Sequence, residues 1–124
     1  MEKFLNLMIG GTLGTIARYL LAGSIYRVMG TDFPYGTTIV NIAGCFILGF
    51  LVSVSETKFL FGANTRLLLM IGFCGAFTTF STLIFETNNL VKDGEVIRAF
   101  LNVLLSVIIG FIVFRGGVLL GERI

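Results

Sequence analysis

The residues most able to bind an ion or take part in chemistry lie in an apolar stretch at residues 72–82, which reads GFCGAFTTFST. Two glycines and a cluster of hydroxyl side chains interrupt what is otherwise a long hydrophobic run. Glycines and hydroxyls that bond back to the backbone can accommodate a break in a membrane helix. A break at Gly75 to Thr78 would free carbonyl oxygens, which coordinate hard cations, and N–H groups, which favour anions. The alternative is a continuous helix with a packing face of small residues, and the residues alone favour neither.

Two further polar side chains interrupt the apolar segments that precede this stretch. Arg18 lies deep in the first segment, where a buried arginine is costly and usually faces a cavity, a partner or an ion path. Asn41 lies near the start of the second segment, close to Thr37 and Thr38. Its amide can join neighbouring helices through hydrogen bonds or line a polar path, and both interpretations stay open.

Enzymatic chemistry is not indicated. The chain has no histidine and no paired carboxylates, and we interpret Glu86 as a structural or interfacial carboxylate. The two cysteines, Cys45 and Cys74, lie inside apolar runs, so we interpret them as small buried hydrophobes that do not form a zinc site. A net charge of +2 without a basic cluster argues against nucleic acid as a partner.

The composition places these residues in a membrane. Of the 124 residues, 56% are hydrophobic and 13% are charged, and so short a soluble chain could not bury that much apolar surface. Charged residues separate four apolar blocks, each close to the roughly 20 residues that span a bilayer. The blocks run from Phe4 to Tyr26, between Asp32 and Glu56, between Arg66 and Glu86, and from Glu95 to Leu120. We therefore expect an all-α, multi-pass protein of the plasma membrane, with residues 1–124 forming a single domain of four transmembrane helices.

The connections between the blocks are short and carry helix boundary signals. Pro34 stands where the second helix could begin. Asn64 or Thr65 could cap the third helix. Residues 92–95, which read KDGE, predict a tight turn before the fourth helix.

The distribution of basic residues gives little preference for one orientation in the membrane. Four lie on the side of the two termini and three on the other: Lys3, Lys58, Arg66 and Arg123, against Arg27, Lys92 and Arg98. Either a weak preference decides the orientation, or copies insert both ways up.

Small residues spaced four apart predict close helix packing. They are Gly10 and Gly14, Gly72 and Ala76, and Gly117 and Gly121. Four helices leave little room inside one chain for an aqueous path, so we expect any transport path to form between subunits of an oligomer.

Three segments together resemble the Fluc family of fluoride channels, also called CrcB. Residues 10–19, GGTLGTIARY, resemble the family segment GGxxGAxxRY/W, and residues 34–44, PYGTTIVNIAG, resemble PxGTLxVNxxG. Residues 72–82 resemble GFxGGxTTFST and are followed by Glu86. Order and spacing agree over the whole chain, which makes the combined signal specific.

The resemblance implies passive export of fluoride through two narrow pores of an antiparallel, dual-topology homodimer. It implies a structural sodium ion at the dimer centre, held by the carbonyl groups of Gly75 and Thr78 after a break in the third helix. It also implies that Arg18 draws anions towards a vestibule. The pore-lining positions that it implies are Asn41, Phe80, Ser81, Thr82 and the position of Leu83.

Two positions depart from the family pattern. Leu83 replaces a phenylalanine, and Gly110 stands near the place of a serine on the fourth helix, for which Asn102 or Ser106 could substitute. An alternative is therefore a subunit of a heterodimeric channel that needs a paralogue to supply the missing ring. A remote alternative is a small proton-coupled drug exporter, for which Glu86 is the only candidate carboxylate.

Overall fold

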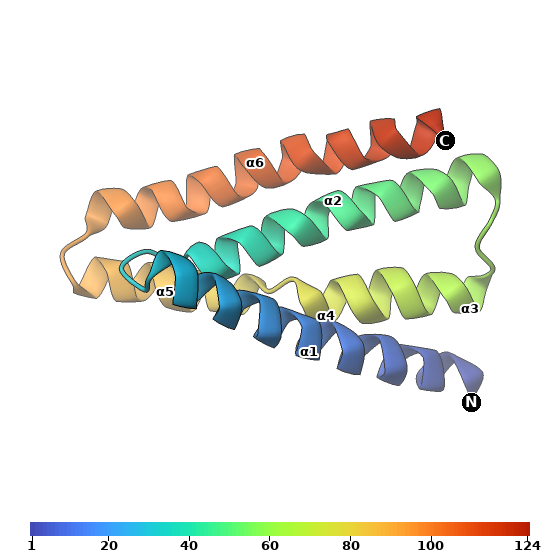
Figure 1. Ribbon diagram of the computed structural model, residues 1–124, viewed down its shortest axis with the longest axis horizontal. Coiled ribbons are helices and arrows are strands. Elements are labelled where there is room, and N and C mark those ends of the chain that lie inside the picture. Colours follow the sequence, from blue (N-terminus) through green and yellow to red (C-terminus); the bar gives the residue numbers. More distant parts are fainter.

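The computed structural model describes residues 1–124 and consists only of helices joined by short loops (Figure 1). Four segments are long and apolar enough to cross a membrane, which confirms the all-α, four-span prediction for a multi-pass membrane protein. The first, second and fourth are the continuous helices α1 (Glu2–Met29), α2 (Tyr35–Lys58) and α6 (Val96–Arg123). The third is divided into α3 (Ala63–Arg66), the π-helix η1 (Leu67–Cys74), α4 (Gly75–Phe77) and α5 (Phe80–Lys92).

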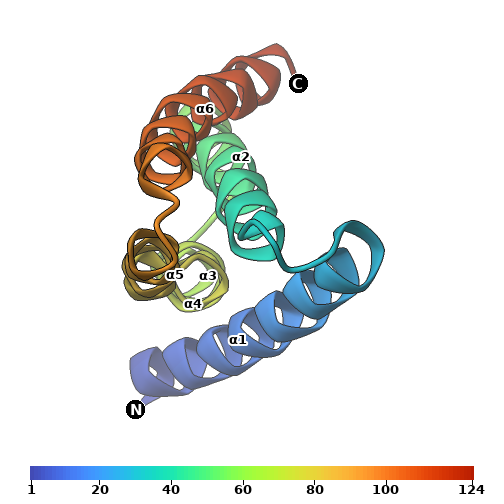
Figure 2. The same ribbon diagram turned by 90° about the vertical axis from the view of Figure 1, so that its left-hand side faces the viewer.

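The four spans pack mainly as two pairs, with both termini at the same end of the molecule (Figures 1 and 2). In one pair α1 packs on η1 and α4, and in the other α6 packs on α2. Glycines allow these close approaches, because a side chain at Gly10 would collide with the η1 backbone and one at Gly117 with the α2 backbone. The predicted small-residue faces are therefore used inside the chain.

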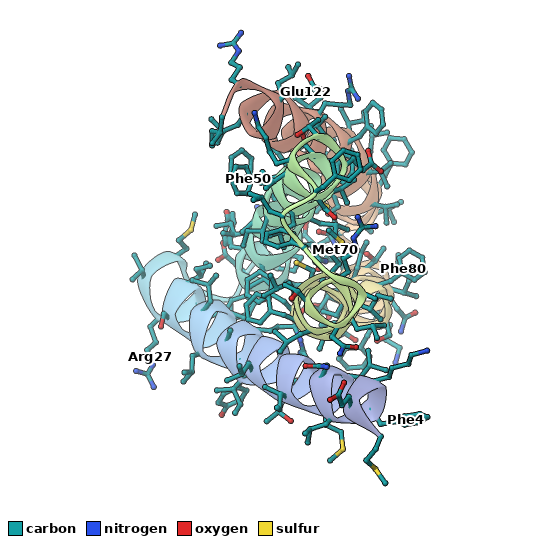
Figure 3. All side chains as sticks on the ribbon, turned by 90° about the vertical axis from the view of Figure 1, so that its right-hand side faces the viewer. Phe4, Arg27, Phe50, Met70, Phe80 and Glu122 are labelled. Carbon is teal, nitrogen blue, oxygen red and sulfur yellow. The ribbon has the colours of Figure 1, made fainter.

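The single chain buries little of its apolar surface. Only 21 of the 124 residues are buried, and many large hydrophobic side chains point outwards around all four spans (Figure 3). Such a surface suits an environment of lipid or of further protein.

The helix boundaries agree with the sequence signals at two of three places. Helix α2 begins directly after Pro34, and Gly94 makes the turn before α6 with a φ angle of +77°. The prediction that Asn64 or Thr65 caps the third helix is wrong. That helix begins at Ala63 without a side-chain cap, and Asn64 Nδ2 donates instead to Glu2 Oε2 at 3.1 Å.

The third span is longer than the apolar block predicts, because it continues past Glu86 to Lys92. A helix can continue beyond the hydrocarbon region through polar residues. The first charged residue after an apolar block therefore does not mark the end of the helix.

Candidate functional site

The third span is broken in the middle, as the family resemblance implied. Thr78 (φ −87°, ψ 154°) and Thr79 (φ −148°, ψ 117°) are extended between α4 and α5. Gly75 retains helical angles (φ −62°, ψ −37°), so the glycine is not the point of the break. The first half of the span ends at Phe77 and the second half starts at Phe80.

Side chains from α1 and α2 hold the two sides of the break. Asn41 Oδ1 accepts a hydrogen bond from the Thr79 N–H at 2.7 Å, and Asn41 Nδ2 donates to the Thr79 carbonyl at 3.0 Å. Arg18 Nε donates to the Ala76 carbonyl at 3.1 Å. Because no water reaches a lipid-embedded backbone, such partners are needed wherever a helix ladder is interrupted.

The Thr79 hydroxyl caps the second half of the span. Its Oγ1 accepts from the Thr82 N–H at 3.3 Å, so Thr79 is the N-cap of α5. It also donates to Thr82 Oγ1 at 3.0 Å and lies 3.4 Å from Ser81 Oγ.

These side-chain contacts free two backbone carbonyls. In a continuous helix the Gly75 carbonyl would accept from the Thr79 N–H, and the Thr78 carbonyl from the Thr82 N–H. The first N–H donates to Asn41 instead, and the second donates to Thr79 Oγ1. No side chain replaces either donor. The two carbonyl oxygens that the family resemblance assigns to a cation are thus oxygens released by the break.

Two cavities flank the break and share one wall residue, Thr79. The first has a volume of about 370 Å³ and is lined mainly by polar and charged side chains of α1 and α5. Its charged and hydroxyl-bearing members include Arg18, Arg27, Tyr26, Thr37, Thr82 and Glu86. The second has a volume of about 310 Å³, is mostly apolar, and lies between α2, the third span and α6. Its members include Asn41, Gly75, Thr78, Phe80, Leu83 and Ser106.

The first cavity carries more positive than negative charge. Neither arginine is ion-paired, since the only salt bridge in the chain joins Arg98 to Glu95. Glu86 accepts a hydrogen bond from Thr37 Oγ1 at 2.7 Å and from the Tyr26 hydroxyl at 3.2 Å. This carboxylate therefore ties α5 to α1 and α2.

The structure brings most of the predicted pore residues to the second cavity, with two exceptions. Thr82 lines the first cavity, and the exposed Ser81 lines neither. Phe80 is 73% exposed and points away from the other spans (Figure 3), whereas Leu83 is 5% exposed.

The two possible substitutes for the missing serine on α6 behave differently. Asn102 is fully buried and bonded, because its Nδ2 donates to Thr87 Oγ1 at 2.9 Å and its Oδ1 accepts from Thr38 Oγ1 at 3.2 Å. The Ser106 hydroxyl lines the second cavity, is shielded from solvent and has no hydrogen-bond partner. Of the two, only Ser106 offers a free donor to the cavity.

Sequence reasoning missed Thr79 as the residue that organises the site. A hydroxyl residue directly before a new helix, followed by a polar residue three positions later, is a helix-start signal, and Thr79 with Thr82 fits it. It also missed the cluster of Tyr26, Thr37 and Glu86, whose members are brought together only by tertiary packing.

Comparisons with known proteins cover almost the whole chain. Residues 5–118 match the family described as CrcB-like protein, Camphor Resistance (CrcB). A protein of Solidesulfovibrio magneticus, named fluoride-specific ion channel FluC, is 41% identical over 124 residues, which cover 100% of this chain and 99% of the relative. Proteins with the same name are 43% identical in Desulforapulum autotrophicum, over 99% of this chain and 98% of the relative, and 44% identical in a Geobacter species, over 87% of each chain.

Proposed function

This chain belongs to the CrcB-like protein family, and on that premise we propose that it is a fluoride-selective ion channel that exports fluoride passively from the cytoplasm across the plasma membrane. Fluoride is proposed as the ion because the chain is similar over its full length to relatives named fluoride-specific ion channels. It also supports a channel, with no enzymatic activity.

The anion path runs through the two cavities and past Thr79. Fluoride is small and strongly hydrated, so a selective path must replace its water with hydrogen-bond donors. The first cavity, with Arg18 and Arg27, forms the vestibule where anions gather. The second cavity, which shares Thr79 with it, forms the dehydrated part of the path.

The donors along this path are side-chain groups that have an N–H or O–H not used in a hydrogen bond within the protein. Asn41 Nδ2 has a second N–H beyond the one that bonds to Thr79. The Thr82 hydroxyl accepts from Thr79 Oγ1 and so retains its own proton, and Ser106 supplies the unpartnered hydroxyl. The edge of the Phe80 ring carries partial positive charge and can contact an anion.

Arg18 attracts anions without blocking their exit. A free guanidinium inside a narrow pore would hold an anion too tightly for conduction. The contact from its Nε to the Ala76 carbonyl fixes this side chain against the break. Its two terminal nitrogens make no protein hydrogen bond, and Arg18 lines the vestibule cavity.

A sodium ion held by the Gly75 and Thr78 carbonyls is part of the proposal. Sodium is a hard cation that prefers oxygen ligands, and both carbonyls have lost their helical donors to side chains. Gly75 is exposed, with no other part of the chain within 4 Å of where a side chain would begin. A second copy can therefore approach this point and contribute its own two carbonyls. The ion would supply a fixed positive charge that joins the two subunits.

A dual-topology homodimer accounts for three features of the single chain. The exposed Phe80 and Ser81 lie beside the break, where a partner subunit would complete the second cavity. The exposed Gly75 lies there too. The near balance of basic residues at the two ends permits insertion both ways up.

A heterodimer with a paralogue is the second candidate, and Leu83 favours it. The Leu83 side chain lines the second cavity but offers no electropositive edge, so each homodimer pore would have fewer ring contacts for fluoride.

The purified chain, reconstituted alone in liposomes, tests the proposal. We expect rapid fluoride efflux, measured with an ion-selective electrode, and negligible chloride efflux. Equal efflux of both ions would contradict fluoride selectivity. No fluoride efflux from folded, dimeric protein would contradict the homodimeric channel, and recovery of efflux on co-reconstitution with a paralogue would then establish the heterodimer.

A further inference from the structure

Three sulfur-containing side chains that are separated in the sequence line the second cavity. Cys45 belongs to α2, whereas Met70 and Cys74 belong to η1. Both cysteines are free thiols. The proposed anion path uses hydrogen-bond donors and a ring edge, so it assigns no role to these sulfur atoms.

The packing of α2 against the third span brings the two cysteines to the same contact. Gly44 of α2 packs against the side chain of Thr78. Cys45 follows Gly44 directly, and Cys74 lies one helical turn before Thr78, whose N–H donates to the Cys74 carbonyl at 3.1 Å. The two segments run in opposite directions (Figure 1), so Cys45 and Cys74 both lie towards the same end of this contact, and both line the second cavity.

The surroundings of the thiols leave room for a ligand. Gly110 of α6 faces Cys45, and the missing side chain leaves space for about one methyl group, which would contact the Cys45 sulfur at 3.4 Å. The cavity has a volume of about 310 Å³. It also contains the buried Ser106 hydroxyl, which has no partner in the protein. An unpartnered hydroxyl and two free thiols therefore line the same cavity, and none of the three makes a side-chain hydrogen bond within the protein.

We propose that Cys45 and Cys74 together bind one thiophilic metal ion of the mercuric, cuprous or silver class, with the Met70 thioether as a weaker third ligand. Sulfur ligands select such soft ions, whereas the carbonyl oxygens of Gly75 and Thr78 select hard ones. The site is therefore chemically separate from the sodium site, although both lie near the break. If the second cavity conducts fluoride as proposed above, an ion bound in that cavity also stops the conduction.

Mercuric chloride is a suitable probe, because it is uncharged and can enter an apolar environment. Each thiol loses its proton to solvent, and two mercury–sulfur bonds replace the two mercury–chloride bonds. Two protons and two chloride ions leave for each metal ion bound. No atom changes oxidation state, so the step needs no oxidant or reductant.

Intact-protein mass spectrometry of the full chain in detergent measures this binding directly. We expect one mercury per chain with no chloride retained, and a mass gain of one mercury less two hydrogens. In Cys45→Ser or Cys74→Ser, the remaining thiol should hold mercury with one chloride still attached. Because two thiols act together, the unmodified chain should keep its mercury at mercaptoethanol concentrations about 100-fold higher than either variant tolerates.

Two mercury ions per chain, each with a chloride, would overturn the proposal, and so would equal sensitivity of the chain and its single-cysteine variants to mercaptoethanol. Met70→Leu should lower retention less than either cysteine substitution. Cys74 is 2% exposed, so Cys74→Ala serves as a second variant if serine impairs folding. None of these measurements involves fluoride, so failure here is distinct from failure of the channel proposal.

Discussion

The amide of Asn41 bonds to both backbone groups of Thr79, accepting from the N–H at 2.7 Å and donating to the carbonyl at 3.0 Å. This pairing fixes which end of the amide faces which backbone group, and leaves one Nδ2 hydrogen unused. A single side chain thus holds the helix break and presents a donor to the adjacent cavity. Loss of the amide should affect both stability and conduction.

Replacing Asn41 with leucine tests this dual role. The substitution keeps the side chain's size but leaves the N–H and carbonyl of Thr79 without partners, which should cost about 1–3 kcal/mol for each group that stays buried. We expect a lower unfolding temperature in detergent, followed by circular dichroism, and at least a tenfold loss of fluoride efflux. Asn6→Leu is the control, because Asn6 is partly exposed and bonds only to the Glu2 carbonyl. Wild-type stability in Asn41→Leu would contradict the role in the break.

Replacing Thr79 with valine or with serine distinguishes the effect of the side chain's shape from the effect of its hydroxyl group. Valine removes the cap on the Thr82 N–H, which should cost about 0.5–2 kcal/mol, whereas serine keeps it. The uncapped N–H can return to the Thr78 carbonyl, so Thr79→Val should also weaken sodium binding. We expect only Thr79→Val to lose thermal stabilisation by added sodium. Loss of this response in Thr79→Ser as well would show that the hydroxyl is not the cause.

The sequence predicted the spans because long apolar blocks are a local signal. The break followed only from the family resemblance, because the residues at 72–82 alone favoured neither a break nor a continuous helix. The sequence could not show that Thr78 and Thr79, and not a glycine, are the extended residues of the break. That outcome depends on Asn41, 38 residues away, which competes with the helix ladder for the Thr79 N–H.

The sequence also could not show that the two thiols line the same cavity. The sequence interpretation of Cys45 and Cys74 as separate buried hydrophobes considered each within its own apolar run. Their placement around one cavity follows from the register between α2 and the third span, which is set by tertiary contacts such as that of Gly44 with Thr78.

Neutral substitutions of the two vestibule arginines should have different effects on stability. Arg18→Gln and Arg27→Gln each remove one positive charge from the first cavity, so both should lower fluoride efflux several-fold at low ionic strength. The loss should diminish in about 0.1 M impermeant salt, where the Debye length is about 10 Å. Only Arg18 also donates to the Ala76 carbonyl, so only Arg18→Gln should lower the unfolding temperature. An equal loss of stability in Arg27→Gln would contradict this assignment.

Two glycines on α6 should respond differently to serine. At Gly110 the nearest atom to an added side chain is the Cys45 sulfur, at 3.4 Å, so Gly110→Ser should fold normally. At Gly117 the added side chain would meet the backbone of Phe46 and Phe50, so Gly117→Ser should separate α6 from α2. The yield of monodisperse protein in size-exclusion chromatography measures both outcomes. Normal folding of Gly117→Ser would show that this helix pair does not require close contact.

Removing the hydroxyl of Ser106 should reduce conduction without reducing stability. Because this hydroxyl is buried and has no partner, Ser106→Ala should leave the unfolding temperature unchanged or raise it. Ser53→Ala is a matched control, since Ser53 also has a buried, unpartnered hydroxyl but lines neither cavity at the break. If Ser106 donates to fluoride in the path, efflux should fall several-fold in Ser106→Ala and stay at the wild-type rate in Ser53→Ala. Equal efflux from both variants would remove Ser106 from the anion path and leave Asn41, Thr82 and Phe80 as its proposed contacts.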